Sequence, residues 1–142
     1  MKDVFILMFI GLTLLGCNAQ ESPELDVVEI VYREDARGSS LYCSLKEMQL
    51  EVTQSGLQSD ERRVVLEGNQ WNQLVTMIAD LNLSSIDQLE VPSNDRASDR
   101  TGTAALIIKT NNQEFESVLF DAGNPPLELQ KLVNYIIDLI EN

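Results

Sequence analysis

The chain has no histidine among its 142 residues and only two cysteines, Cys17 and Cys43. Without histidine, it lacks the side chain that most often acts as a general base near neutral pH. Basic residues are scarce too, with 10 Lys and Arg against 23 Asp and Glu, and the formal net charge is −13. This deficit argues against nucleic acid as a partner, because binding to phosphates needs clustered Lys or Arg.

Long apolar runs are also rare, and the one present covers residues 4–15, between Lys2 and the pair Gly16-Cys17. A membrane-spanning helix needs about 20 apolar residues, whereas this shorter run has the charge-then-apolar layout of a secretory signal. A cysteine directly after a small residue is typical of a bacterial lipoprotein signal. We therefore expect residues 1–16 to be a cleaved signal peptide and Cys17 to be lipidated. Plain secretion and an uncleaved membrane helix are the alternatives.

Residues 17–25 are expected to form a flexible tether, because they are polar and have no apolar period. Two or three acyl chains hold a small domain on a membrane, since each buried methylene contributes about 0.8 kcal/mol. Asn18 rather than aspartate follows Cys17, which favours the outer membrane of the cell envelope over the inner one. The periplasmic and surface faces of that membrane both stay open.

Lipidation of Cys17 would leave Cys43 as the only free thiol, so no disulfide within the chain is expected. A lone cysteine in an apolar segment is most often a small buried side chain. A catalytic thiol would need a base to form the thiolate, and the chain has no histidine to provide one. We expect no cofactor and no metal site, since no motif for either is present.

Two segments have the apolar period of amphipathic helices. The first covers residues 70–81, with Asn69 at the position of an N-cap. In the second, the apolar stripe runs from Leu129 to Ile140. Pro125-Pro126 are expected to start this helix, because the first helical turn tolerates proline.

Alternation of apolar and polar residues predicts six strands, at residues 27–33, 41–45, 48–52, 62–67, 103–110 and 113–120. Asn111-Asn112 suits a two-residue hairpin turn, which would pair Ile108 with Phe115 and Lys109 with Glu114. The apolar positions change from odd to even numbers at Lys46-Glu47. A tight turn or bulge is therefore expected there.

This order of elements predicts an α+β fold, a single antiparallel sheet of about six strands with two helices packed on one face. Residues 26–142 would form one globular domain. Each helix follows a strand pair, so two β-β-α units related by duplication, or alike by chance, would account for the pattern. Residues 84–89 are expected to form a short helical turn, and residues 91–102 a polar loop that is either mobile or functional.

Several short segments resemble a family of small lipoproteins of unknown function found in Bacteroidota. These are Arg37-Gly38, Trp71, the stretch from Val91-Pro92-Ser93 through Arg96 to Asp99, and Phe120-Asp121-Ala122-Gly123-Asn124-Pro125-Pro126. Family members often have glycine or alanine after the aspartate that matches Asp99, where this chain has Arg100-Thr101. The resemblance implies a location and a fold pattern but no activity.

The candidate site residues are Arg37, Arg96, Asp99 and Asp121, all in predicted loops or at strand ends. The arginines, with Arg100, would either brace the loops through ion pairs or bind an anionic or peptidic ligand. The loop aspartates match no calcium-binding spacing. Asp99 and Asp121 could act as an acid and base pair only if they lie within about 10 Å and are not engaged by arginine.

We therefore expect a lipid-anchored, non-enzymatic cell-envelope domain that binds another protein or an envelope component. The alternative is an envelope hydrolase that uses Asp99 and Asp121. A third hypothesis is an inhibitor that presents residues 92–102 to a protease or lysozyme, which predicts an ordered, protruding loop.

Overall fold

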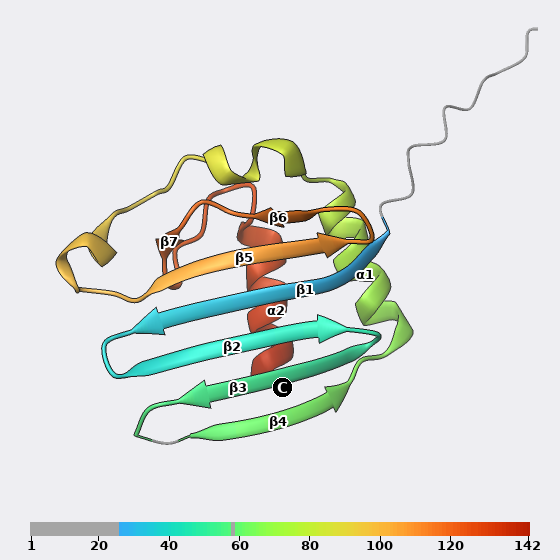
Figure 1. Cartoon of the computed structure of the whole chain (residues 1–142), viewed down its shortest axis with the longest axis horizontal. Helices are drawn as coiled ribbons and strands as arrows, with labels where there is room; N and C mark the ends of the chain where they lie inside the picture. The colour runs from blue at the N-terminus through green and yellow to red at the C-terminus, as the bar shows by residue number, and fades with distance from the viewer. Residues whose placement is uncertain (1–25, 58) are drawn as a thin grey trace, which may run out of the picture.

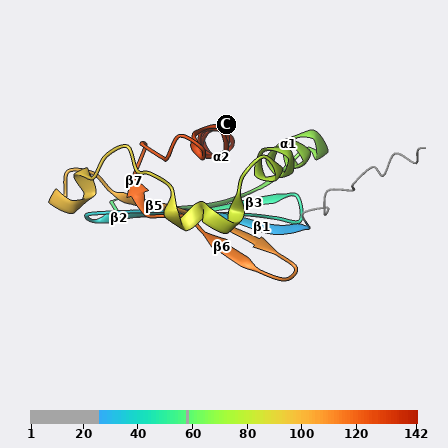
Figure 2. The same cartoon turned by 90° about the horizontal axis from the view of Figure 1, so that it is seen from above.

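Seven strands form one antiparallel sheet, and two helices cover one of its faces (Figures 1 and 2). The computed structural model describes residues 26–57 and 59–142. The predicted signal peptide, Cys17 and the tether lie outside the described residues. The predicted α+β class is confirmed, with seven strands in place of about six.

Most strands pair with the strand that follows them in the chain, and the order across the sheet is β4-β3-β2-β1-β5-β6. β6 pairs with one end of β5, and β7 pairs with its other end. The strands are β1 (Val27–Ala36), β2 (Ser39–Lys46), β3 (Gln49–Ser55), β4 (Asp60–Val65), β5 (Thr103–Thr110), β6 (Glu114–Glu116) and β7 (Phe120–Asp121). The helices are α1 (Gly68–Ala79) and α2 (Gln130–Glu141), and the short 3₁₀ helices are η1 (Leu83–Gln88) and η2 (Asp95–Ser98). The helical turn expected at residues 84–89 is η1, which begins at Leu83 and ends at Gln88.

The turn or bulge predicted at Lys46-Glu47, where the apolar positions change from odd to even numbers, is a two-residue turn between β2 and β3. Glu47 and Met48 both have positive φ angles, and Lys46 pairs with Gln49 across the turn. The predicted pairs of the later hairpin, Ile108 with Phe115 and Lys109 with Glu114, are also confirmed.

The single strand predicted at residues 113–120 is wrong, because it divides into β6 and β7. Ser117 lies between the two strands, and its hydroxyl oxygen accepts a hydrogen bond from the N–H of Leu106. Its own N–H donates to the carbonyl of Leu106. Ser117 thus bonds to the edge of β5 through its side chain as well as its backbone, and the regular ladder is interrupted there.

The helix boundaries differ from the predicted ones at both N-termini. The N-cap of α1 is Glu67 rather than Asn69, and the side chain of Gln70 accepts a hydrogen bond from the N–H of Glu67. Asn69 lies inside the first turn, where its side chain accepts from the N–H of Gln70. Pro126 precedes a separate turn, and α2 begins only at Gln130.

The core lies between the sheet and the helices. Its fully buried side chains include Ile30, Leu45, Leu106 and Ile108 from the sheet, Leu74 and Ile78 from α1, and Leu132 and Ile136 from α2. Trp71 is partly buried and packs against this cluster. The apolar stripes read from the sequence are therefore the faces that the helices bury. Neither helix of the described residues has the length and apolar composition that crossing a membrane requires.

No helix formed by the described residues covers the second face of the sheet (Figure 2). Charged side chains pair across it: Lys109 with Glu29 and Arg63 with Glu51 from neighbouring strands, and Arg33 of β1 with Glu116 of β6 across the intervening β5. An antiparallel sheet with one buried face commonly has such a polar second face.

Candidate functional site

The candidate site residues gather at one end of the sheet. Arg37 and Gly38 form the turn between β1 and β2, Asp121 ends β7, and Arg96 and Asp99 belong to η2 and the residue after it. Figure 1 shows η2 beside this end of the sheet, which is opposite the end where β1 begins at Val27. We call this the loop end of the domain. The structure thus brings all four predicted residues to one region.

Asp121 fixes the position of η2. Its Oδ2 accepts hydrogen bonds from the hydroxyl of Ser93 and from the N–H of Asp95, the latter at 2.7 Å. Its Oδ1 accepts from Arg96 twice, from the N–H at 3.0 Å and from the guanidinium Nη1 at 3.1 Å. The carboxylate therefore satisfies free N–H groups at the start of η2 and holds residues 93–96 against β7.

The environment of Asp121 favours its charged form. Burial of the carboxyl would raise its pKa, but the hydrogen bonds from Ser93 and from the backbone and side chain of Arg96 and the backbone of Asp95 outweigh this effect and hold the pKa well below its ordinary value of 3.8. A carboxyl group that stays ionised cannot act as a general acid. Its geometry suits a structural brace.

Asp99 is also engaged by an arginine, but in the open. Its Oδ2 lies 3.1 Å from Nη2 of Arg37, and the two side chains are 71% and 87% exposed. Asp99 ends η2 with a positive φ of 55°, a conformation that aspartate tolerates better than most residues. Both aspartates of the proposed acid and base pair are thus in ion pairs with arginine. An acid and base pair for hydrolysis required that Asp99 and Asp121 not be engaged by arginine, and this requirement is not met.

Three arginines line one open pocket of about 550 Å³ between η2 and the end of β1. They are Arg37, Arg96 and Arg100, and each has a carboxylate partner, Asp99, Asp121 and Asp95 respectively. Of the two roles considered for these arginines, the ion pairs that hold the loops together are therefore the contacts present in the structure. Arg37 and Arg100 are mostly exposed, so their weak surface pairs could exchange for a ligand carboxylate at small cost.

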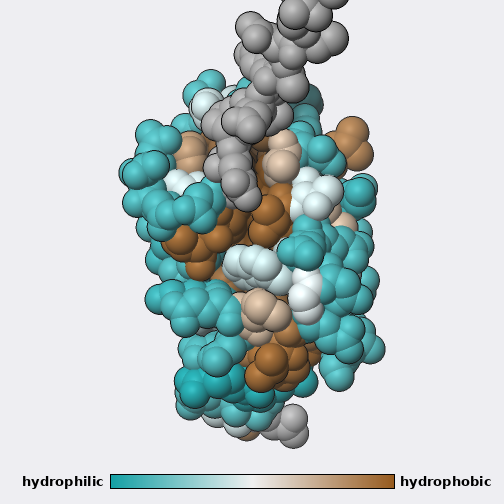
Figure 3. Space-filling model, turned by 90° about the vertical axis from the view of Figure 1, so that its right-hand side faces the viewer, coloured by the Kyte–Doolittle hydropathy of each residue, from teal (hydrophilic) through white to brown (hydrophobic). Residues whose placement is uncertain are grey.

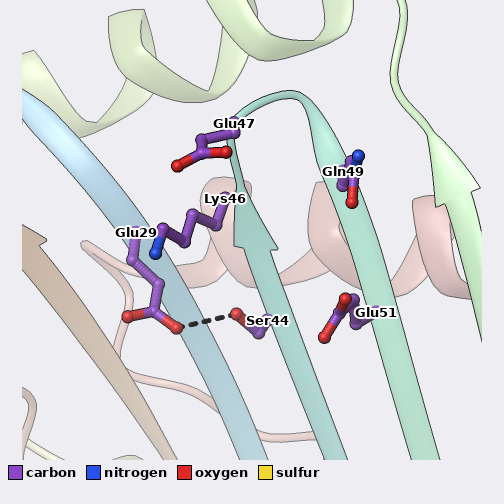
Figure 4. Close-up of a pocket in the computed structure, with 6 residues that line it drawn as sticks. All are labelled: Glu29, Ser44, Lys46, Glu47, Gln49 and Glu51. Atoms are coloured by element: carbon purple, nitrogen blue, oxygen red, sulfur yellow. Dashed lines mark hydrogen bonds between the residues drawn. The ribbon is translucent and has the colours of Figure 1, made fainter.

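Figure 4 shows a second pocket, of about 300 Å³, on the uncovered face of β1, β2 and β3. Glu29 makes two of the polar contacts in this region. Its carboxylate accepts a hydrogen bond from the hydroxyl of Ser44 at 2.8 Å and forms an ion pair with Lys109 at 3.0 Å. Burial alone would raise the pKa of Glu29, but these contacts lower it below the ordinary value of 4.5. Sequence reasoning missed this cluster, although the alternation of the strands places Glu29 and Lys109 on one face. The charge of Glu29 is thus already balanced by Lys109.

Cys43 is fully buried in β2, as its apolar setting predicts. Burial raises the pKa of its thiol to about 12 from an ordinary 9.0. The thiol form therefore dominates at physiological pH, and the residue packs as an apolar side chain. Among the described residues, no group of three or more acidic or cysteine side chains could hold a metal ion.

Comparison of the chain with known protein families gives no match. Comparison with curated proteins gives no match either.

Proposed function

We propose that this protein is a lipid-anchored domain of the cell envelope that binds another protein or an envelope component without catalysing a reaction. The proposal includes cleavage after residue 16, acylation of Cys17, an outer-membrane location and membership of the small Bacteroidota lipoproteins that its segments resemble. Support comes from the lipoprotein-type signal, and from the engagement of Asp99 and Asp121 by arginines.

One structural relationship carries the binding part of the proposal. The described chain enters the domain at Val27, and β1 then runs ten residues to Ala36, a distance of about 33 Å. The loop end, with Arg37, η2 and the turn after β7, lies at the far end of this strand (Figure 1). A domain tethered near Val27 would present its loop end away from the membrane. Loops on a rigid scaffold are also where binding residues concentrate.

The anchor is tested by labelling growing cells with radioactive palmitate. We expect the wild-type protein to incorporate label and the Cys17→Ser variant to incorporate none. Labelling of both proteins, or of neither, would contradict the anchor. Mass spectrometry of the mature N-terminus gives an independent check, since it should begin at an acylated Cys17.

The binding end is tested by photo-crosslinking in intact cells. A photoreactive residue is placed at Arg37 or Arg100 in the loop end, or at Glu47 in the turn at the opposite end as a matched control. All three side chains are exposed. We expect discrete crosslinked products from the first two positions and none from Glu47. Equal products from all three positions, or no product from Arg37 and Arg100, would contradict the proposal.

A specific observation favours the inhibitor hypothesis as a second candidate. The segment that contains η2 projects past the ends of the strands (Figure 2), and Asp121 holds it in place through four hydrogen bonds. An ordered, protruding loop is what an inhibitor of this kind presents. We expect inhibition of a lysozyme or a protease at stoichiometric concentration, reduced in Arg100→Ala. Full enzyme activity across a panel of both classes would reject this candidate.

A further inference from the structure

An apolar groove of about 420 Å³ lies between α2 and the loop end of the sheet. Figure 2 shows that the sheet continues past α2 toward η2, where no long helix covers it. The groove runs along this gap. Its apolar wall combines Leu41 of β2 with Val133, Ile137 and Ile140 of α2.

The apolar wall comes from a second side of α2. Leu132 and Ile136 are completely or almost completely buried in the core. Val133 and Ile140 are also buried, but together with Ile137 they border the groove. Leu41 and Ile137 are only half-buried. Ile137 thus leaves part of the apolar surface of α2 accessible to a ligand in the groove.

The rim of the groove is acidic. Glu34 and Glu141 line it, and its lining contains no Lys or Arg. Neither carboxylate forms an ion pair within residues 26–57 and 59–142, and Glu34 instead accepts a hydrogen bond from the hydroxyl of Tyr32 at 3.1 Å. The arginine-lined pocket differs, because its arginines already have carboxylate partners. The net charge of −13 adds to the negative field at this rim.

We propose that this groove binds a basic segment of a partner protein, with an aliphatic side chain in the groove and flanking Lys or Arg side chains on Glu34 and Glu141. The apolar wall accounts for the aliphatic group, and the two unpaired carboxylates account for the cations. This inference rests on the proposed binding function and gives it a surface and a chemistry.

The test uses the full chain as cells produce it, held in neutral phosphatidylcholine nanodiscs, with empty nanodiscs as the blank. The probe is the dye-labelled peptide acetyl-Lys-Leu-Lys-Leu-Lys-amide, and binding is followed by fluorescence anisotropy at low salt. Two matched peptides replace either Leu by Ala or Lys by Glu throughout. We expect the Lys-Leu peptide to bind at least tenfold more tightly than either matched peptide.

The site is tested with two double variants that change the net charge equally. Glu34→Gln with Glu141→Gln removes the rim charges and keeps an acceptor for Tyr32. Glu128→Gln with Asp138→Asn is the control, because both side chains are exposed and neither lines the groove. We expect about a tenfold loss of affinity for the rim variant, since each exposed pair contributes about threefold, and less than a twofold change for the control.

A third variant, Ile137→Ala, tests the apolar wall. Ile137 is half-buried, so the variant should keep its fold, which circular dichroism checks. We expect it to weaken the Lys-Leu peptide several-fold and to leave the Lys-Ala peptide unchanged. Equal effects of the two double variants would mean unspecific attraction and would overturn the proposal. Equal binding of the Lys-Leu and Lys-Ala peptides would overturn it as well.

The outcome separates this inference from the function on which it rests. If the peptide does not bind while Arg37 and Arg100 still give crosslinked products in cells, the groove is not the binding surface but the binding function stands. If neither peptide binding nor crosslinking is found, both proposals fail.

Discussion

Arg96 contacts the carboxylate of Asp121 both through its guanidinium, at 3.1 Å, and through its backbone N–H, at 3.0 Å. The two side chains are 19% and 3% exposed. The ion pair of Arg37 with Asp99 has the same length but lies in solvent. The two arginine–aspartate pairs therefore have the same N···O distance but differ in burial and in the number of hydrogen bonds that the aspartate accepts, and these differences predict different contributions to stability.

We expect Asp121→Asn to lower the melting temperature by roughly 5 °C or more. Each oxygen of Asp121 accepts two hydrogen bonds, whereas an amide keeps one acceptor and points a donor at the remaining donors. Asp99→Asn is the matched control, since asparagine tolerates the positive φ and an exposed pair contributes about 0–1 kcal/mol. Thermal unfolding followed by circular dichroism checks both variants. Equal melting temperatures of the two variants would contradict the assignment of Asp121 as the brace of the loop.

The low pKa of Asp121 also predicts a pH dependence. A carboxyl whose pKa is lower in the folded state stabilises that state above its ordinary value of 3.8 and loses the contribution as the pH falls below it. The stability of the wild type should therefore be level between pH 7 and pH 5 and fall below about pH 4. Asp121→Asn should fall less steeply over the same range. Parallel curves for the two proteins would show that other carboxyl groups control acid unfolding.

Gly102 predicts a further difference in stability, because it lies where the loop that contains η2 joins β5. A Cβ atom at Gly102 would lie 3.0 Å from the carbonyl oxygen of Asp35 and 3.1 Å from the Cβ of Ala36. We expect Gly102→Ala to destabilise the protein by about 1–3 kcal/mol, the usual cost of overpacking. Gly68→Ala is the control, since its Cβ meets nothing within 4 Å and alanine favours a helix. Chemical denaturation should show unchanged or slightly higher stability for this control.

The regular part of the fold was predictable because it depends on local patterns. Both helices, five of the strands and the turn at Glu47-Met48 follow from apolar periods and from the change of parity. The errors occur where a side chain competes with the backbone. Gln70 makes Glu67 the cap of α1, and Ser117 interrupts the strand pairing between β6 and β7. Neither contact has a signal in hydrophobic periodicity.

The candidate site was predictable only in part. The residue types of the loops indicated that arginines and aspartates could pair, but not which ones, because Arg96 and Asp121 are 25 positions apart in the chain. The fold brings them together by pairing β7 with the start of β5. The groove beside α2 could not be predicted at all, since it depends on how far α2 extends over the sheet rather than on any residue pattern.

Cys43 gives a prediction about reactivity that reports on the whole fold. Its thiol is buried, and its pKa is raised to about 12, so at pH 8 the thiolate fraction is about a thousandfold below that of an ordinary thiol. In a Cys17→Ser protein, we expect a thiol-reactive disulfide reagent to label Cys43 at least a thousandfold more slowly in buffer than in denaturant. Thr53→Cys, made together with Cys43→Ala, is the control, because position 53 lies on the adjacent strand with an exposed side chain. The control should react rapidly in both conditions.

Rapid labelling of Cys43 in native buffer would contradict its place in the core. Slow labelling that accelerates in Asp121→Asn would show that the hydrogen bonds of Asp121 limit the opening of the domain.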